Sequence, residues 1–302
     1  MKKFRILAFD GGGVKGALSL EILNNILKKF PNFLDNIDLF TGTSTGSIIA
    51  TLLAKGYDLK SLNHLYSEKE AKKIFSQSSL NLIRPKYKNN NLKDMIEDYF
   101  PKNFLISDFK KYIFIPAFYL GDEKTISWYP KFFSNLPKSK TRNTSVIDAI
   151  LASSAAPTFF PSHKGYIDGG VIANSPTAVT ILSILESMPS LTSKDIVLLS
   201  IGTGDSPERI SGKTNKWGII QWSFHPFSKM KSPLLSLLMD GMSSLEDLYS
   251  KEILKDNYFR INPKVPKFIQ LDNYKLIFLL RQIGKSANTE DLYKFIENIY
   301  LK

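Results

Sequence analysis

The 302-residue chain has no cysteine and only three histidines, at positions 64, 163 and 225. The lack of Cys excludes disulfide bonds, a thiolate nucleophile, an iron–sulfur cluster and a Cys-based zinc site. The three histidines have neither helical nor hairpin spacing, which argues against a His-based metal site. We therefore expect neither a metal nor a cofactor.

Long hydrophobic runs are also missing. The amino-terminal apolar stretch is interrupted by Asp10 and three glycines before it reaches the length of a signal-peptide core. The longest aliphatic runs, such as the one at 276–280, fall well short of the ~20 residues that cross a bilayer. We expect a cytoplasmic or peripheral membrane protein, with export by a non-classical route left open.

Composition and charge narrow the class of protein but do not identify its binding partner. With 43% hydrophobic and 23% charged residues, the chain has the proportions of a soluble globular protein, so disorder and collagen are excluded. Its net charge of +12 suits nucleic acid or anionic lipid, and the sign alone does not choose between them. A lysine-rich solvated surface explains the charge equally well.

Predicted strands and helices alternate along the chain. Residues 4–9 form an apolar strand followed by a glycine turn and a helix, and 37–41 begin a second such unit, whose helix ends at Gly56. Further strands are predicted at 112–120 and 195–201. Further helices are predicted at 145–154, 175–187, 234–249 and 288–300. This alternation predicts an α/β fold with a layered sheet.

The chain shows no internal repeat and no interdomain linker, so we expect one domain over 1–302. The polar stretch 76–110, which contains Pro85 and Pro101, is predicted to be a surface insertion around a short amphipathic helix near 92–99.

The glycine cluster G-G-G-V-K-G at 11–16 admits two interpretations. It matches a dinucleotide-binding fingerprint, which also needs an acidic residue at the end of the next strand. The candidates Asp35 and Asp38 lie before or at the start of that strand. Alternatively, bare glycine amides at a helix amino terminus form an anion cradle, which in acyl transfer stabilises an oxyanion.

The turn G-T-S-T-G at 42–46 fits the G-x-S-x-G pattern of a nucleophile elbow, between a predicted strand and a predicted helix. Gly42 and Gly46 remove side chains where strand and helix come close, so that Ser44 projects at the start of the helix. The sequence therefore predicts Ser44 as a nucleophile.

A serine nucleophile needs a base, and the histidines are poor candidates. The surroundings of His64 and His225 favour structural or surface roles, whereas His163 lies five residues before D-G-G at 168–170. Asp168 is the alternative base. Because a free Asp has a pKa near 3.9, this role requires burial or hydrogen bonding beside Ser44.

Four motifs occur together and in order. They are D-G-G-G-V-K-G at 10–16, G-T-S-T-G at 42–46, S-S-A-A-P-T-F-F-P at 153–161 and D-G-G at 168–170. In this combination the chain resembles the patatin-like phospholipase family of lipid acyl hydrolases. The resemblance covers at least residues 4–204, and 205–302 are expected to complete the same domain.

The resemblance implies a three-layer α/β/α sandwich around a mainly parallel sheet and a Ser–Asp dyad without catalytic His, metal or cofactor. It assigns Ser44 as nucleophile, Asp168 as base and three oxyanion donors, Gly11, Gly12 and Gly13. Lys15 stands where the family often has Arg, as a phosphate contact or a solvated side chain. Residues 153–161 are expected to brace the site.

The implied function is hydrolysis of fatty-acyl esters of membrane glycerolipids, of phospholipase A or lysophospholipase type, through an acyl-serine. Three alternatives stay open: an acyltransferase using the same intermediate, a nucleotide-binding protein, and a non-catalytic lipid-binding module. Head group, acyl position, chain length and the need for an activator are undetermined. No nucleic-acid partner is expected.

Residues 217–239 contain apolar segments, and Lys216, Lys229 and Lys231 lie near or within them in the sequence. We expect this region to control substrate access, as a lid or as a face toward an anionic membrane. For the helix in this region, the spacing of Leu234, Leu237 and Leu238 favours ordinary core packing over membrane contact. For the Trp-containing segment 217–227, the sequence favours neither core packing nor membrane contact.

Overall fold

In the computed structural model, which describes residues 3–76, 84–124, 126–206, 210, 214–223 and 232–302, seven strands form one mixed sheet. The strands are β1 (Phe4–Phe9), β2 (Leu39–Gly42), β3 (Tyr112–Tyr119), β4 (Tyr129–Ser134), β5 (Tyr166–Asp168), β6 (Ile196–Ile201) and β7 (Tyr258–Ile261). Their order is β4-β3-β2-β1-β6-β7, with β5 paired to β3. All pairs are parallel except those that β4 and β5 make with β3. The predicted mainly parallel sheet is confirmed.

Both faces of the sheet are buried. Along β1, Leu7 and Phe9 join one hydrophobic core, whereas Ile6 and Ala8 join a second core on the opposite face. Because alternate side chains of a strand point to opposite faces, a strand covered on both sides reads as a continuous apolar run. This is why residues 4–9 were recognisable from the sequence.

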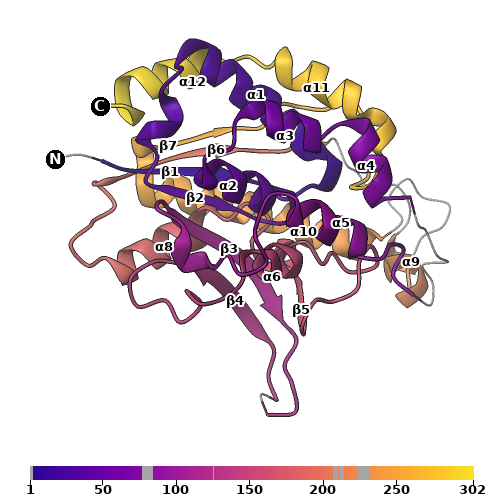
Figure 1. Ribbon diagram of the computed structural model, residues 1–302. Helices are drawn as coiled ribbons and strands as arrows, with labels where there is room; N and C mark the ends of the chain where they lie inside the picture. The colour runs from indigo at the N-terminus through magenta and orange to yellow at the C-terminus, as the bar shows by residue number, and fades with distance from the viewer. Residues whose placement is uncertain (1–2, 77–83, 125, 207–209, 211–213, 224–231) are drawn as a thin grey trace.

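Helices cover each face and complete three layers (Figure 1). The core that contains Leu7 and Phe9 is covered by α1 (Gly16–Lys29), α2 (Thr45–Lys55), α3 (Leu59–Leu65), α4 (Glu68–Ile74), α5 (Asn90–Glu97), α6 (Val146–Ser153), α11 (Ile277–Lys285) and α12 (Glu290–Phe295). The opposite face carries α7 (Gly170–Ala173), α8 (Thr177–Ser187) and α10 (Pro233–Leu254), with the short α9 (Ile219–Ser223) beside α10. The predicted α/β/α sandwich is confirmed.

Single turns of 3-10 helix, and one π-helical turn near the carboxyl terminus, connect these elements. They are Gly13–Lys15, Phe33–Asn36, Ile106–Asp108, Thr214–Lys216, Lys255–Asn257, Tyr274–Leu276 and the π-helical Ile296–Tyr300. No helix among the described residues is both long enough and apolar enough to cross a membrane.

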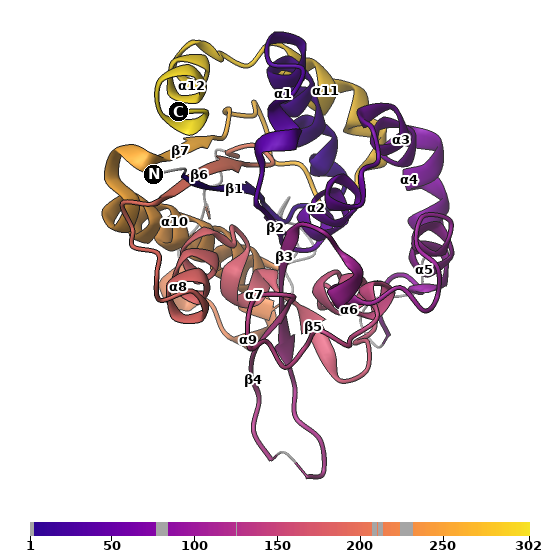
Figure 2. The ribbon, with the colours of Figure 1, turned by 60° about the vertical axis from the view of Figure 1, so that its left-hand side comes forward.

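Two parts of the fold differ from the sequence expectation. The amphipathic helix predicted near 92–99 is present as α5. The described part of 76–110 is nevertheless more than a surface insertion, because Leu92, Ile96 and Phe100 join the core that contains Leu7 and Phe9. The β3–β4 connection was not anticipated, and it forms a hairpin that projects from the body of the molecule (Figure 2). At its tip Ile126 is 95% exposed and Trp128 is 73% exposed.

Parallel strands bring several loops to one edge of the sheet. β1 ends in Asp10 and the glycine cluster, the adjacent β2 ends in the serine turn, and β6 on the other side of β1 ends at Gly202 and Thr203. In sheets of this kind ligands bind beyond the carboxyl ends of the strands. The glycine and serine motifs therefore lie at the edge where a site is expected.

Candidate active site

Ser44 occupies a strained turn between β2 and α2. Its backbone has φ 54° and ψ −122°, a conformation that costs a residue with a side chain of the order of 1–3 kcal/mol. The strain is typical of a nucleophile elbow, in which the turn projects the hydroxyl at the amino terminus of the following helix. The strand and helix that the sequence predicted on either side of Ser44 are both present.

The two glycines of the turn allow close packing. A Cβ atom on Gly42 would lie 2.1 Å from the carbonyl oxygen of Gly46, and one on Gly46 would lie 2.2 Å from the carbonyl oxygen of Phe9. Both distances are far inside van der Waals contact. The glycines are therefore required where α2 crosses the ends of β1 and β2.

Asp168 ends β5 and is buried, with 1% of its surface exposed. Its Oδ1 accepts a hydrogen bond of 2.7 Å from the amide of Gly170. Its Oδ2 has no partner with hydrogen-bond geometry among the described residues. The structure nevertheless brings Ser44 to this carboxyl group, because burial raises the pKa of Asp168 to about 7 while the Gly170 amide and the Ser44 hydroxyl lower it.

One short segment positions both residues. Ser153 Oγ accepts a 3.0 Å hydrogen bond from the Ser44 amide, and the carbonyl of Ala155 accepts one of the same length from the Asp168 amide. The Ser153 carbonyl also accepts a 3.4 Å bond from the Gly169 amide. The described contacts thus agree with the expectation that 153–161 brace the site, and they single out Ser153 as a positioning residue.

Replacing Ser153 with Ala is expected to lower kcat by about tenfold and to leave KM within about twofold, because a buried amide without a partner costs about 1–3 kcal/mol. The loss acts on a backbone that is already strained and that carries the Ser44 hydroxyl. The matched control is Ser250→Ala, which removes another buried hydroxyl, bonded to Thr177 at 2.7 Å. Equal losses of kcat in both variants at equal stability would contradict a positioning role.

The glycine cluster lies beside the serine turn, but its three amides are not equivalent. The Gly11 amide donates to the carbonyl of Asn174 at 2.9 Å and is not available to an oxyanion in this structure. Within the described residues, the amides of Gly12 and Gly13 make no hydrogen bond, and Gly13 has a φ of 59° that suits glycine. The candidate oxyanion donors therefore narrow to Gly12 and Gly13.

A buried ion pair that the sequence did not reveal anchors this cluster. Arg260 on β7 donates to both oxygens of Asp10, one of them at 3.0 Å, and also to the hydroxyls of Ser175 and Ser200. The Asp10 side chain is 4% exposed and that of Arg260 is 12% exposed. The pair fixes the residue from which the glycine turn begins.

The two histidines that the structure describes, His64 and His163, do not join this site. His163 Nε2 lies 2.8 Å from Asp148 Oδ1 on α6, and the side chain of His64 is 68% exposed. His225 lies outside the described residues. The titratable group that the structure places beside Ser44 is the carboxyl group of Asp168.

Replacing His163 with Ala is therefore expected to change turnover by less than about threefold and to leave the acidic limb of the kcat/KM profile in place. The variant removes one of two side chains that contact the Asp148 carboxylate, the other being Lys164 at 2.6 Å. Stability is expected to fall modestly, since partly exposed ion pairs contribute about 1 kcal/mol or less. If turnover instead fell by about two orders of magnitude, the loss typical of a missing general base, His163 would again be a candidate base.

Three adjoining cavities surround the site. The apolar cavity, of about 70 Å³, includes Ser44 and is lined mainly by hydrophobic side chains, among them Ile48, Leu65, Phe75, Leu92, Met95 and Phe160. The mixed cavity, of about 150 Å³, contains Gly11, Gly12 and Lys15, and it shares Phe159 and Leu271 with the apolar cavity. The polar cavity, of about 510 Å³, shares Lys15, Asn174 and Asp240 with the mixed cavity.

Lys15 is half-buried at the boundary of the mixed and polar cavities. The structure also brings Lys86 to the mixed cavity, where it pairs with Asp272. Within the described residues no cluster of three or more His, Asp or Glu side chains could hold a metal ion. The arrangement can thus bring a hydroxyl, a buried carboxyl group and two free amides to one ester carbonyl.

Comparison with known proteins gives consistent matches over this site. A family model described as Patatin-like phospholipase matches residues 7–181. The chain is 30% identical to the protein CotR of Bacillus subtilis over 98% of each chain, and 31% identical to the protein teg of Priestia megaterium over 98% of this chain and 99% of that one. It is also 29% identical to a cGAMP-activated phospholipase of Escherichia coli, over 90% of this chain and 84% of the relative.

Proposed function

The chain belongs to the patatin-like phospholipase family, and from this premise we propose that it is a lipid acyl hydrolase of phospholipase A or lysophospholipase type. Membership supports lipid hydrolase activity and a lipid substrate. The finer proposal is that it cleaves fatty-acyl esters of membrane glycerolipids through an acyl-serine on Ser44.

One observation carries the proposal. A serine in a strained turn lies beside a buried carboxyl group whose pKa is raised to about 7 and whose Oδ2 has no hydrogen-bond partner among the described residues. A general base is most effective when its pKa is near the working pH. Asp168 therefore has the properties of a base for Ser44 without help from a histidine.

In the proposed mechanism Asp168 takes the proton of Ser44 as the serine oxygen bonds to the ester carbonyl carbon. The electron pair of the carbonyl moves to its oxygen, which the amides of Gly12 and Gly13 stabilise. The intermediate then collapses, the bond to the alcohol breaks, and Asp168 returns the proton to the leaving alkoxide. A water molecule, deprotonated by the same carboxylate, then attacks the acyl carbon. The bond from that carbon to Ser44 Oγ breaks, Asp168 returns the proton to Oγ, and a fatty acid is released.

The apolar cavity supports an acyl substrate. It begins at Ser44 and runs between α2, α3, α4 and α5, where its lining is almost entirely hydrophobic. Burying each CH₂ group of an acyl chain contributes about 0.8 kcal/mol to binding. At about 70 Å³ the cavity has room for the methylene groups next to an ester carbonyl, whose carbon would then lie at the serine.

A fluorophosphonate probe tests the proposal directly, because it forms a covalent adduct only with an activated serine. We expect the peptide of the wild-type protein that contains Ser44 to gain the mass of one probe less HF, because the serine oxygen displaces fluoride, and we expect Ser44→Ala to gain none. In parallel, wild-type protein is expected to release fatty acid from phospholipid vesicles. Each assay is run with and without cGAMP, the activator named for the Escherichia coli relative. No labelling and no release under either condition would refute the proposal.

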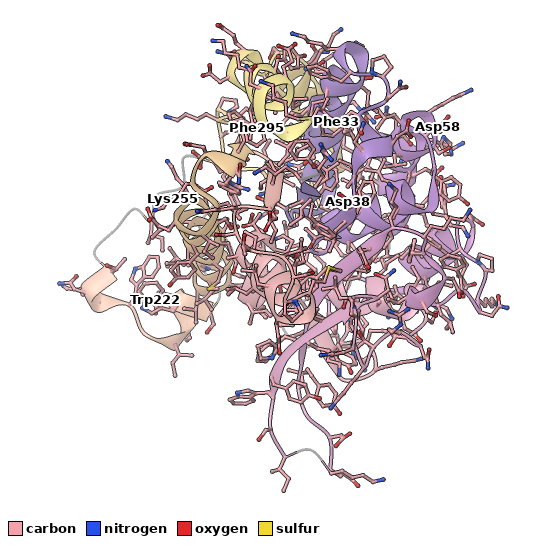
Figure 3. All side chains as sticks on the ribbon, turned by 90° about the vertical axis from the view of Figure 1, so that its left-hand side faces the viewer. Phe33, Asp38, Asp58, Trp222, Lys255 and Phe295 are labelled. Atoms are coloured by element: carbon pink, nitrogen blue, oxygen red, sulfur yellow. The ribbon has the colours of Figure 1, made fainter. Side chains whose placement is uncertain are left out.

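We also propose a peripheral contact with an anionic membrane through α9 and α10. The expectation of ordinary core packing was wrong for α10, because Leu234, Leu237 and Leu238 are 45–49% exposed. On α9, Ile219 is 84% exposed and Ile220 is 72% exposed. Figure 3 shows Trp222 of α9 standing away from the body of the molecule. Exposed apolar side chains close in the chain to exposed Lys216 suit the surface of an anionic bilayer, whereas Lys229 and Lys231 lie outside the described residues.

Vesicle co-sedimentation tests this contact. The double substitution Ile219→Glu and Ile220→Glu is expected to lower binding to anionic vesicles at least tenfold, and added salt is expected to weaken wild-type binding. Phe278→Glu on α11 is the matched control, since Phe278 is 72% exposed in the opposite layer. If both variants lowered vesicle binding equally, membrane contact through α9 and α10 would be contradicted. If binding did not depend on salt or on lipid charge, electrostatic attraction to the membrane would be excluded.

A further inference from the structure

Tyr66 follows α3 and lines the apolar cavity together with Ser44 and Thr45. It is buried, with 5% of its surface exposed. Its hydroxyl donates a 2.9 Å hydrogen bond to the carbonyl of Thr45 and is also hydrogen-bonded to the Thr45 hydroxyl. Because a phenol has one proton, which the carbonyl accepts here, the Thr45 hydroxyl is the donor of the second bond. Both bonds thus end on the residue that directly follows the nucleophile.

The two hydroxyls form a neutral pair that water does not reach. Burial raises the pKa of Tyr66 well above its ordinary value, and the bond from Thr45 lowers it by less. The phenol therefore keeps its proton at neutral pH and donates it to the Thr45 carbonyl. Thr45 is itself only 5% exposed, so water cannot replace a partner that its hydroxyl loses. Removing either hydroxyl leaves the other without this bond.

Tyr66 also contacts the helix that follows the glycine cluster. A Cβ atom on Gly16 would lie 2.6 Å from Cε1 of Tyr66 and 2.8 Å from Thr45 Oγ1, so the backbone of Gly16 packs directly against this pair. The Gly16 amide donates to the carbonyl of Gly13. Gly13 is one of the two candidate oxyanion donors, and it lines the same cavity. Tyr66 therefore lies between the serine turn and the turn that carries an oxyanion donor.

We propose that Tyr66 is a positioning residue, which fixes the turn of Ser44 relative to the glycine cluster so that the serine oxygen and the Gly13 amide meet one ester carbonyl. The hydroxyl of Tyr66 holds the serine turn through Thr45, and its ring supports the glycine cluster through Gly16. The proposal rests on the proposed function, because it concerns the same acyl transfer. A shift of about 1 Å in a reacting group can lower a rate by about 10²-fold.

Two other roles for Tyr66 fit its contacts less well. To stabilise the charge on the ester oxygen, the phenol would have to donate its proton to the substrate, but the Thr45 carbonyl already accepts it. A residue that only forms the wall of the cavity needs no hydroxyl, and Phe75 and Phe160 form such walls nearby. The two hydrogen bonds to Thr45 therefore favour a positioning role.

Tyr66→Phe removes the hydroxyl and keeps the ring in the cavity wall. With nitrophenyl butyrate as substrate, we expect kcat to fall about tenfold and KM to stay within about twofold, because the ester still binds but meets a displaced nucleophile. The rate of fluorophosphonate labelling of Ser44 is expected to fall by a similar factor. The acidic limb of the kcat/KM profile is expected to stay near pH 7, because Asp168 is unchanged.

Tyr57→Phe is the matched control. The Tyr57 hydroxyl also donates to a backbone carbonyl, that of Tyr99 at 2.8 Å, but Tyr57 is not in the described lining of the apolar cavity. We expect this variant to keep kcat within about twofold of the wild-type value, even where its melting temperature falls as much as that of Tyr66→Phe. Equal losses of kcat in the two variants would overturn the proposal. A raised KM with unchanged kcat in Tyr66→Phe would also overturn it, since that result is expected of a wall residue.

Thr45→Val tests whether the hydroxyl of Tyr66 acts through Thr45. Val keeps the shape of Thr and removes its hydroxyl, so we expect this variant alone to lower kcat about threefold. In the Thr45→Val protein, Tyr66→Phe is expected to lower kcat by about threefold instead of tenfold, because one of the two bonds is already absent. Losses that multiply fully would overturn the action through Thr45. If Tyr66→Phe did not fold, the loss of kcat in Thr45→Val would decide the proposal.

The positioning role and the proposed function fail in different ways. Labelling and fatty-acid release are measured with and without cGAMP, the activator named for the Escherichia coli relative. If wild-type protein is neither labelled at Ser44 nor able to release fatty acid in either condition, the proposed function fails and the positioning role fails with it. If wild-type protein is active and Tyr66→Phe keeps its kcat, only the positioning role fails.

Discussion

Replacing Asp168 with Asn is expected to lower kcat by roughly 10²- to 10⁴-fold, the range in which a general base contributes, while it stabilises the folded protein above pH 7. Asn keeps an oxygen that can accept the hydrogen bond from the Gly170 amide, but it cannot take a proton from Ser44. The wild-type protein is expected to lose kcat/KM about tenfold per pH unit below about 7, because Asp168 must be ionised to act as a base.

The effect on stability follows from the same raised pKa. The folded protein holds the Asp168 proton up to a pKa of about 7, whereas the unfolded chain releases it near the ordinary value of 3.8. The contribution of this group to stability is therefore full below pH 3.8 and is lost as the pH rises through about 7. At pH 8 the buried carboxylate costs up to about 4 kcal/mol, at about 1.4 kcal/mol per pKa unit.

Urea denaturation at pH 5 and pH 8 measures this difference. Asp168→Asn is expected to raise the free energy of unfolding at pH 8 and to raise it less at pH 5. Asp58→Asn is the control, because the pKa of exposed Asp58 is lowered by hydrogen bonds from Ser61 and Asn also caps helices well. A variant that keeps wild-type kcat, or that gains no stability at pH 8, would contradict the assignment of Asp168 as a buried base.

The sequence predicted the elements whose signals are local. β1 and β2 are short apolar runs that end in glycine turns, and the strain at Ser44 follows from the spacing of Gly42 and Gly46. Such patterns fix where a strand ends and a helix begins within a few residues. They were enough to predict Ser44 as a candidate nucleophile and, with the D-G-G turn, Asp168 as its candidate base.

The remaining parts of the site depend on contacts between distant residues. Arg260 meets Asp10 across 250 positions, and no pattern around 260 marks it as a partner. The Gly11 amide was expected to be an oxyanion donor, but it donates a hydrogen bond to the carbonyl of Asn174. The sequence of a glycine triplet does not indicate such a contact with a distant residue. Leu238 is exposed although its helical spacing favoured core packing. The spacing of leucines along a helix does not indicate whether another layer of the protein covers them.

Replacing Gly46 with Ala is expected to destabilise the protein by about 3 kcal/mol or more and to abolish most of its activity. The new Cβ would lie 2.2 Å from the carbonyl oxygen of Phe9 and 2.8 Å from that of Asp10, both of which are backbone atoms. Backbone at the end of a buried central strand cannot move aside as a flexible side chain can. The first turn of α2 must shift instead, and Ser44 moves with it away from Asp168.

Gly241→Ala is the matched control, because Gly241 lies within α10 and a Cβ there would meet no atom within 4 Å. In a helix interior this substitution is expected to stabilise by about 0.5–1 kcal/mol, the difference in helix propensity between Gly and Ala. The two variants thus add the same methyl group, but the expected changes in the free energy of unfolding have opposite signs. Denaturation curves and the fluorophosphonate labelling of Ser44 are measured for both. A Gly46→Ala protein as stable and as reactive as wild type would show that the close crossing of α2 over β1 does not hold the nucleophile in place.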